Sequence, residues 1–152
     1  MRTIGIRVAP KRVTFVVYDA AESEILNVEG ITVPKAMDTP EQLKFVRSTI
    51  LDVIREYEVT RAGIRVSEGN AQNPSIERIE LEGVIQEAFA SSDVEGYFCG
   101  RIANIAARLG MPRTQLKSHL DGSEDYAAVE NWMAHSKEER EAIVAAIGAA
   151  HV

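Results

Sequence analysis

The sequence predicts an α/β protein built on one mixed sheet of five strands, with helices on both faces. Two observations lead to this prediction. Three segments in the first third of the chain have the alternation or the β-branched composition of strands. After residue 38, stretches with helical spacing of apolar residues alternate with short strand-like stretches. A run of strands followed by alternating helices and strands favours a sheet that is partly antiparallel and partly parallel.

The three N-terminal strands are predicted at Thr3–Val8, Arg12–Tyr18 and Ile25–Val33. The first alternates aliphatic residues with others, and the second is largely β-branched and aromatic. The third has a weaker pattern because Gly30 lies inside it. Since the connections between these strands are short, they are expected to pair as an antiparallel meander.

Two long amphipathic helices are predicted next. In the first, Thr39 is the expected N-cap, Pro40 takes the first helical position and Gln42 completes a capping box. Its apolar stripe continues to about residue 57. The second helix is expected to open at Asn73-Pro74. Its predicted apolar stripe consists of Ile76, Ile79, Leu81, Val84, Ile85, Ala88 and Phe89.

Two more strands are predicted at Ala62–Ser67 and Tyr97–Gly100, the latter with Cys99 as a buried residue. The loop Glu68–Asn73 between the first of them and the second helix lacks the Gly-Lys-Ser/Thr of a P-loop, so a triphosphate site of that type is not expected. In the last third, helices are predicted at Arg101–Leu109, which Gly110 ends, and at Thr114–Leu120. A third is predicted at Ser123–Ala134, with Ser123 as the N-cap and with Trp132 and Met133 packed on the core. A fourth is predicted from the capping box Ser136–Glu139 to about residue 150.

The order of these elements restricts the topology of the sheet. Crossover connections between parallel strands are right-handed in nearly all proteins. The simplest arrangement starts the parallel part beside the N-terminal strand and adds the last strand outside it. The predicted spatial order of the strands is therefore 3-2-1-4-5.

Composition sets further limits. With 152 residues, 45% of them hydrophobic, the chain suits a single domain spanning 1–152. The 17 basic and 23 acidic residues give a net charge of −6, which argues against a wholesale cationic face but leaves room for a local basic patch. One cysteine excludes a disulfide framework and a multi-cysteine zinc site. No apolar run approaches the roughly 18 residues of a membrane span, so a cytoplasmic protein is expected.

Three local patches, in this order of elements, resemble the RNase H-like superfamily and its small RuvC-like branch, which includes Holliday junction resolvases. The first is Ile4–Ala9 with the hairpin to Asp19, which is similar to the family's opening strand. The second is Ala62–Ser67 followed by Glu80–Gln86, and the third is Glu138–Ala146, where acids precede an alanine-rich run. The resemblance covers almost the whole chain and implies the RNase H-like fold.

The resemblance also implies a site at which this sequence departs from the family pattern. In such enzymes, acids at the ends of strands one and four and on the last helix hold two Mg²⁺ about 4 Å apart for phosphodiester hydrolysis. Here the two strand positions are Arg7 and Arg65, each within a Gly-Ile-Arg-Val tetrapeptide. A neighbouring cation opposes Mg²⁺ binding. The pattern therefore argues against two-metal hydrolysis, and no metal-binding residue or cofactor is assigned.

Arg7 and Arg65 are expected to point to the same face of the sheet at a similar height. Two guanidinium groups within ~6 Å of each other repel, so a partly buried pair needs negatively charged groups beside it. Either they form ion pairs within the protein or they capture a phosphate or carboxylate from outside. Candidate internal partners are Glu68, Glu80, Glu82, Glu138 and Glu141, with Gly83 allowing a second element to approach Glu82.

Three hypotheses about function follow. The first is a non-catalytic RuvC-like subunit that binds nucleic acid or a protein partner, through Arg7 and Arg65 and through the local basic excess of Arg101, Arg108, Arg113 and Lys117. The second is a metal-dependent nuclease whose site is rebuilt from Glu68, Glu82, Glu138 and Glu141, with Mg²⁺ as cofactor. The third is a structural protein without a ligand. The resemblance is also consistent with a homodimer, and the three histidines have no metal-ligand spacing.

Overall fold

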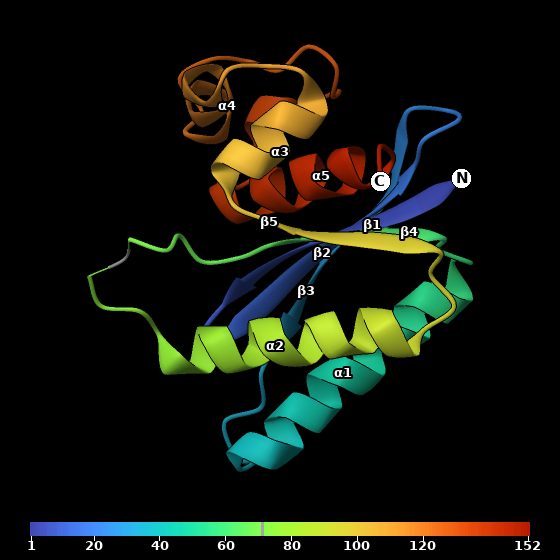
Figure 1. The fold of residues 1–152 in the computed structure, drawn as a ribbon, viewed down its shortest axis with the longest axis vertical. Helices are drawn as coiled ribbons and strands as arrows, with labels where there is room; N and C mark the ends of the chain where they lie inside the picture. The colour runs from blue at the N-terminus through green and yellow to red at the C-terminus, as the bar shows by residue number, and fades with distance from the viewer. Residues whose placement is uncertain (71) are drawn as a thin grey trace.

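The computed structural model describes residues 1–70 and 72–152. Residue 71, in the predicted loop Glu68–Asn73, lies outside the described residues. Five strands form one sheet in the order β3-β2-β1-β4-β5, which confirms the predicted order and fold class (Figure 1). The first three strands pair antiparallel, whereas β4 pairs parallel with both β1 and β5. The strands are β1 (Arg2–Ala9), β2 (Arg12–Asp19), β3 (Glu24–Thr32), β4 (Arg61–Arg65) and β5 (Gly96–Gly100).

Helices cover both faces of the sheet, as predicted. Figure 1 shows α1 and α2 on one side and α3, α4 and α5 on the other. The helices are α1 (Thr39–Glu56), α2 (Ile76–Ser91), α3 (Ile102–Leu109), α4 (Arg113–Leu120) and α5 (Lys137–Ala149), with one short 3₁₀ helix, η1 (Trp132–Ala134). Within the described residues, no helix is long and apolar enough to cross a bilayer.

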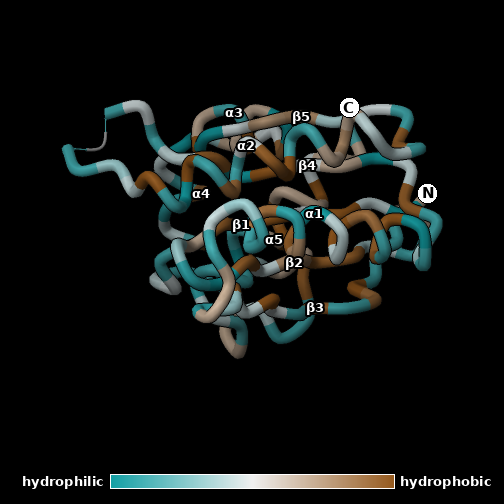
Figure 2. The backbone as a smooth tube through the Cα atoms, turned by 90° about the horizontal axis from the view of Figure 1, so that it is seen from below, coloured by the Kyte–Doolittle hydropathy of each residue, from teal (hydrophilic) through white to brown (hydrophobic). Residues whose placement is uncertain are grey.

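The alternation of β1 divides the core into two layers. Ile4, Ile6 and Val8 belong to the cluster that packs under α1 and α2. The intervening residues face α5, most of whose buried residues belong to the second cluster. Figure 2 shows the hydrophobic segments gathered inside the molecule and hydrophilic ones along its outer loops. The alternation in the sequence therefore directs successive side chains of β1 into two different hydrophobic clusters.

Helix α5 lies directly against the backbones of β1 and β4. A Cβ atom added at Gly5 would lie 2.1 Å from the carbonyl oxygen of Ala142, and one at Gly63 would lie 2.7 Å from that of Ala145. Thr3 Oγ1 donates a hydrogen bond of 2.7 Å to the carbonyl of Ala146. The absence of side chains at two neighbouring strand positions therefore fixes how deeply α5 sits on the sheet.

The start of α1 differs from the prediction by one residue. Asp38, rather than Thr39, is the N-cap, and its carboxylate accepts a 3.0 Å hydrogen bond from the amide of Glu41. Gln42 does not complete a capping box, because its amide donates to the carbonyl of Pro34. Aspartate and threonine both serve as N-caps, so spacing alone did not distinguish the two neighbours. The predicted box at Ser136 and Glu139 is confirmed in both directions.

Replacing Asp38 with alanine is expected to lower the free energy of unfolding by about 1 kcal/mol, because the Glu41 amide loses its acceptor. The matched variant Thr39→Ala should change stability less, since Thr39 is already inside the helix. Urea unfolding followed by far-ultraviolet circular dichroism measures both. A larger loss for Thr39→Ala would contradict the cap assignment.

The helix predicted at Ser123–Ala134 is wrong. Turns and bends occupy most of this segment, and only η1 is helical. Gly122, just before the segment, has a φ of 77°, and Asn131, within it, has a φ of 57°. A right-handed α-helix cannot continue through either residue. Trp132 is fully buried and its Nε1 donates to the His119 carbonyl at 2.9 Å, so its predicted core position is confirmed, whereas Met133 is exposed.

Predictions on the β4–β5 side of the molecule need similar corrections. Helix α2 begins at Ile76 after the N-cap Ser75, later than the predicted opening at Asn73-Pro74. Ile76 and Ile79, which were assigned to its apolar stripe, are exposed. Cys99 is also exposed, because it lies on the face of the edge strand β5 opposite to buried Phe98.

Candidate functional site

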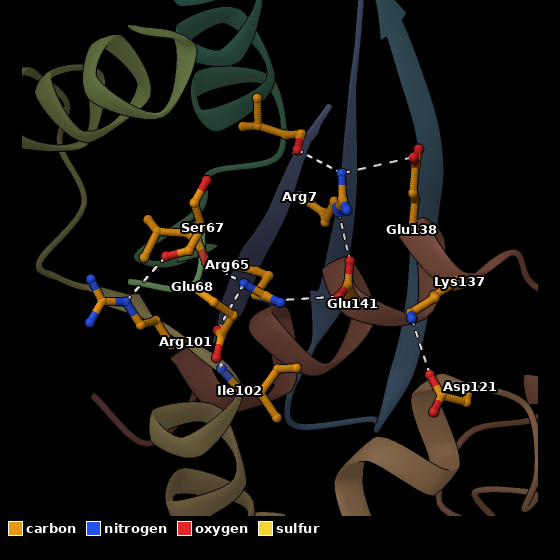
Figure 3. A network of polar contacts seen from close by, with 12 residues as sticks. Arg7, Arg65, Ser67, Glu68, Arg101, Ile102, Asp121, Lys137, Glu138 and Glu141 are labelled. Atoms are coloured by element: carbon orange, nitrogen blue, oxygen red, sulfur yellow. Dashed lines mark hydrogen bonds and ion pairs between the residues drawn. The ribbon is translucent and has the colours of Figure 1, made fainter. Parts of the chain in front are cut away.

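Arg7 and Arg65 lie side by side at the carboxyl ends of β1 and β4, where they are paired in the parallel register. Figure 3 shows Glu141 of α5 between them. Arg7 Nε donates to Glu141 Oε2 at 2.6 Å, and Arg65 Nε lies 3.5 Å from Glu141 Oε1. The Glu141 side chain is only 3% exposed. The predicted juxtaposition of the two arginines is therefore confirmed, and one buried carboxylate serves both.

Two less buried glutamates complete the surroundings of this pair. Glu138, one helical turn before Glu141, approaches Arg7 Nη1 at 3.8 Å. Glu68, just beyond β4, lies 3.1 Å from Arg65 Nη1. Main-chain carbonyls also accept from the arginines, that of Val8 from Arg7 and that of Val66 from Arg65. Each guanidinium is thus held by its own strand end as well as by α5.

A second ion pair, which the sequence analysis missed, adjoins the first. Arg78 Nε donates to Glu82 Oε2 at 2.9 Å, one turn along α2. Glu82 also accepts from both the amide and the hydroxyl of Ser67. Desolvation lowers the pKa of Arg78, as does the positive charge of Arg7. The i,i+4 spacing of Arg78 and Glu82 was the available signal.

The predicted partners do not all join this Arg–Glu cluster, which we define as Arg7, Arg65, Arg78, Glu68, Glu82, Glu138 and Glu141. Glu80 is exposed and makes no ion pair within the described residues. Glu82 faces inward, but toward Arg78 and Ser67 rather than toward Arg7 or Arg65. Gly83 is exposed with nothing within 4 Å of its Cβ position, so the expected close approach of another element is wrong.

The four residues of the predicted basic excess lie in different surroundings. Arg113 points to Glu68 across 3.9 Å. Arg101 Nε donates to the carbonyl of Ser67 at 3.1 Å. Arg108 stacks on Phe98, 4.3 Å from the ring centre, and so belongs to the other end of α3. Lys117 is exposed on α4. Only the first two lie beside the Arg–Glu cluster.

The cluster is close to neutral, with three arginines and four glutamates. A buried charge is strongly unfavourable unless it is paired and hydrogen-bonded. The two most buried acids are paired internally, Glu141 with two arginines and Glu82 with one, although Arg65 Nε and Arg78 Nη2 are buried without a hydrogen-bond acceptor among the described residues. Ion pairs thus join the ends of β1 and β4 to α5, and hydrogen bonds from Ser67 to Glu82 join the residues after β4 to α2.

These residues do not fit the pair of divalent cations that the family resemblance implies. Magnesium prefers oxygen ligands, and a catalytic pair of ions needs several free carboxylate oxygens at one place. Here both oxygens of Glu141 face guanidinium groups, and Arg7 and Arg65 occupy the strand positions at which the resemblance implies acids. Among residues 1–70 and 72–152, no group of three or more histidine, cysteine, aspartate or glutamate side chains is placed to hold a metal ion.

Comparison with solved structures places this geometry in a known fold. Thermus thermophilus RuvC in complex with a Holliday junction substrate superposes with a TM-score of 0.75 at 13% identity, over 99% of this chain and 93% of that one. The chain has the RuvC-like form of the RNase H fold. A second Thermus thermophilus RuvC structure gives a TM-score of 0.70 at 13% identity, covering 99% and 94% of the two chains.

The RuvC-like fold extends to a more distant structure as well. The yeast mitochondrial Holliday junction resolvase matches with a TM-score of 0.56 and 14% identity, over 98% of this chain and 77% of the resolvase. No protein-family model and no curated protein sequence matches the chain. The likeness to RuvC is thus one of fold, and the chemistry of the site depends on the residues present here.

Proposed function

We propose that this RuvC-like chain binds nucleic acid without cutting it. The observation that carries the proposal is the pairing of Glu141 with both Arg7 and Arg65 at the ends of the two central strands. A carboxylate held in this way is a poor ligand for a metal ion, because a bound cation would be repelled by two fixed guanidinium groups. The site is suited to holding the fold together rather than to hydrolysis.

Nucleic acid is favoured as the partner by two further points. The chain superposes along almost its full length on a RuvC that is bound to a Holliday junction. Three exposed basic residues, Arg101, Arg113 and Lys117, lie on or next to α3 and α4. With a net charge of −6 on the whole chain, contact with phosphates would be confined to this local patch and would depend strongly on salt.

The test combines a nuclease assay with a binding assay on the purified chain. Four-way junction, single-stranded and duplex DNA and RNA are incubated with Mg²⁺ or Mn²⁺, and cleavage is followed on gels. We expect no metal-dependent cleavage. Fluorescence anisotropy in EDTA should show binding at low salt, and the logarithm of the binding constant should fall linearly with the logarithm of the salt concentration.

The matched variants are Arg113→Gln and Arg47→Gln, which change the net charge equally. Arg47 lies on α1 and pairs with Glu87, away from α3 and α4. Binding should weaken in the first variant and not in the second. Metal-dependent cleavage that is lost in Glu138→Gln or Glu68→Gln would contradict the proposal and support the nuclease alternative. Absence of binding at low salt would instead favour a protein partner.

A further inference from the structure

A groove of about 520 Å³ lies beside the Arg–Glu cluster, on the face of the sheet that α2 covers. One wall is α2, with Ile79 and Gly83, and the other is the edge strand β5, with Cys99. Ser67, Glu68, Gly69 and Arg101 also line it. This volume is within the range of about 300–1,000 Å³ that is typical of sites for small ligands.

Arg101 differs from the arginines around it in its charged partners. Arg7, Arg65, Arg78 and Arg113 each lie within 4 Å of a carboxylate. Arg101 has no carboxylate partner in the part of the chain that the structure describes, and its Nε donates instead to the Ser67 carbonyl. A positive charge without an acid is therefore present in the lining of the groove.

The structure also fixes the direction of this side chain. The Arg101 amide donates to Asn104 Oδ1 at 2.9 Å, which anchors the main chain at the start of α3. Its terminal nitrogens pass 3.1 Å from the Cβ position of Gly69, so a larger residue at position 69 would crowd them. An arginine oriented through Nε keeps its two terminal nitrogens available for a planar, bidentate contact with an anion.

The acids that line the groove do not cancel this charge. Glu82 is buried and already engaged by Arg78 and by Ser67. Glu68 is engaged by Arg65 and by the amide of Ile102. The groove therefore combines a free guanidinium with bound carboxylates, and it favours an anionic ligand.

The groove also offers apolar side chains for packing. Ile79 is about half exposed, and Val66 and Pro74 also line the groove. Nothing lies within 4 Å of the Cβ position of Gly83, so the α2 wall is open at its centre. A ligand with an anionic group and a group that can pack on aliphatic side chains matches both parts of the groove.

We propose that this groove takes one unpaired nucleotide of a single-stranded nucleic acid, with the phosphate on Arg101 and the base against Ile79. The proposal rests on the nucleic-acid binding proposed above and specifies which form of nucleic acid is preferred. A base inside a duplex is not available to a groove of this size, whereas a base in a single strand is. The phosphate supplies the negative charge that pairs with the Arg101 guanidinium.

Cys99 provides a built-in reporter for the test, because it is the sole cysteine, is exposed and lines the groove. Partial desolvation by its neighbours raises the pKa of the Cys99 thiol, as does nearby Glu82, so the reaction with a maleimide is run at mildly alkaline pH. The rate is followed by mass spectrometry in EDTA and low salt. Saturating oligothymidylate should slow the modification several-fold, and a duplex of equal length should not.

Two variants locate the effect. Arg101→Gln should weaken single-strand affinity by about tenfold, the usual loss for a charged hydrogen bond, while Arg47→Gln should leave it unchanged. Gly83→Leu fills the groove from a helix position where space is open, so it should abolish the protection of Cys99 without loss of folding. Circular dichroism confirms that each variant is folded.

The outcomes separate this inference from the function on which it rests. If the parent binds nucleic acid but Cys99 reacts equally fast and Arg101→Gln binds as well as the parent, the groove proposal is overturned and the proposed function stands. If the parent binds no nucleic acid at low salt, both are overturned. Protection by thymidine monophosphate at the concentration of oligonucleotide used would overturn the assignment to a strand in favour of a free nucleotide.

Discussion

Replacing Gly5 with alanine is expected to lower the free energy of unfolding by about 3 kcal/mol or more, or to prevent folding. The new methyl group would lie 2.1 Å from the Ala142 carbonyl oxygen and 2.2 Å from the Ala146 amide nitrogen. Both are backbone atoms of α5, so no side-chain rotation relieves the contact. The helix would have to move away from β1, and the core beneath it would loosen.

The control for this variant is Gly83→Ala. Its Cβ position on α2 is open, and alanine has a higher helix propensity than glycine by about 1 kcal/mol. Gly83→Ala should therefore be neutral or stabilising. Urea unfolding of both variants, followed by circular dichroism and tryptophan fluorescence, measures the difference. Similar midpoints for the two would show that α5 does not sit on β1 as described.

Replacing Glu141 with glutamine is expected to cost about 3 kcal/mol, the lower end of the penalty for breaking a buried ion pair, because Glu138 and Glu68 remain beside Arg7 and Arg65. Arg7 and Arg65 would keep their positive charges beside each other after losing the one carboxylate that both of them face. Glutamine preserves the shape of the side chain, so the loss reports on charge rather than on a cavity.

Glu138→Gln is the matched control, because it removes a carboxylate from the same helix and the same arginine. Its side chain is 40% exposed and 3.8 Å from Arg7, so its loss should cost less than about 1 kcal/mol. A double-mutant cycle with Arg7→Gln should show coupling to Glu141 that is larger than coupling to Glu138. Equal effects of the two glutamates would contradict a buried, central role for Glu141.

Much of the fold could be predicted because local patterns and topology agreed. The alternation in β1, the short connections and the right-handed crossover rule together restrict the sheet to the observed order. The predictions failed where tertiary contacts decide. The Ser123–Ala134 segment was predicted to be a helix, yet Gly122 and Asn131 take positive φ values and Trp132 packs from the short 3₁₀ helix η1.

The candidate site was predictable to a similar extent. The repeated Gly-Ile-Arg-Val segments placed Arg7 opposite Arg65 as soon as β1 and β4 were neighbours. The choice of Glu141 among five candidate acids depended on how α5 crosses the strands, which no local pattern contains. The sequence could not show that Arg101 has no carboxylate partner among residues 1–70 and 72–152, because this depends on which acids pair with the other arginines.

The close seating of α5 has a consequence for residues that carry no charge. Gly63 makes no ion pair, yet it sets the height of the helix that brings Glu141 to Arg65. A bulkier residue at position 63 would press on the Phe98 ring and on the Ala145 carbonyl, and displacement of α5 would move Glu141 away from Arg65. Substitution of an uncharged glycine would thus alter the ion pairs at the carboxyl ends of β1 and β4. In related chains, we expect the residue at this position to vary together with the two arginines.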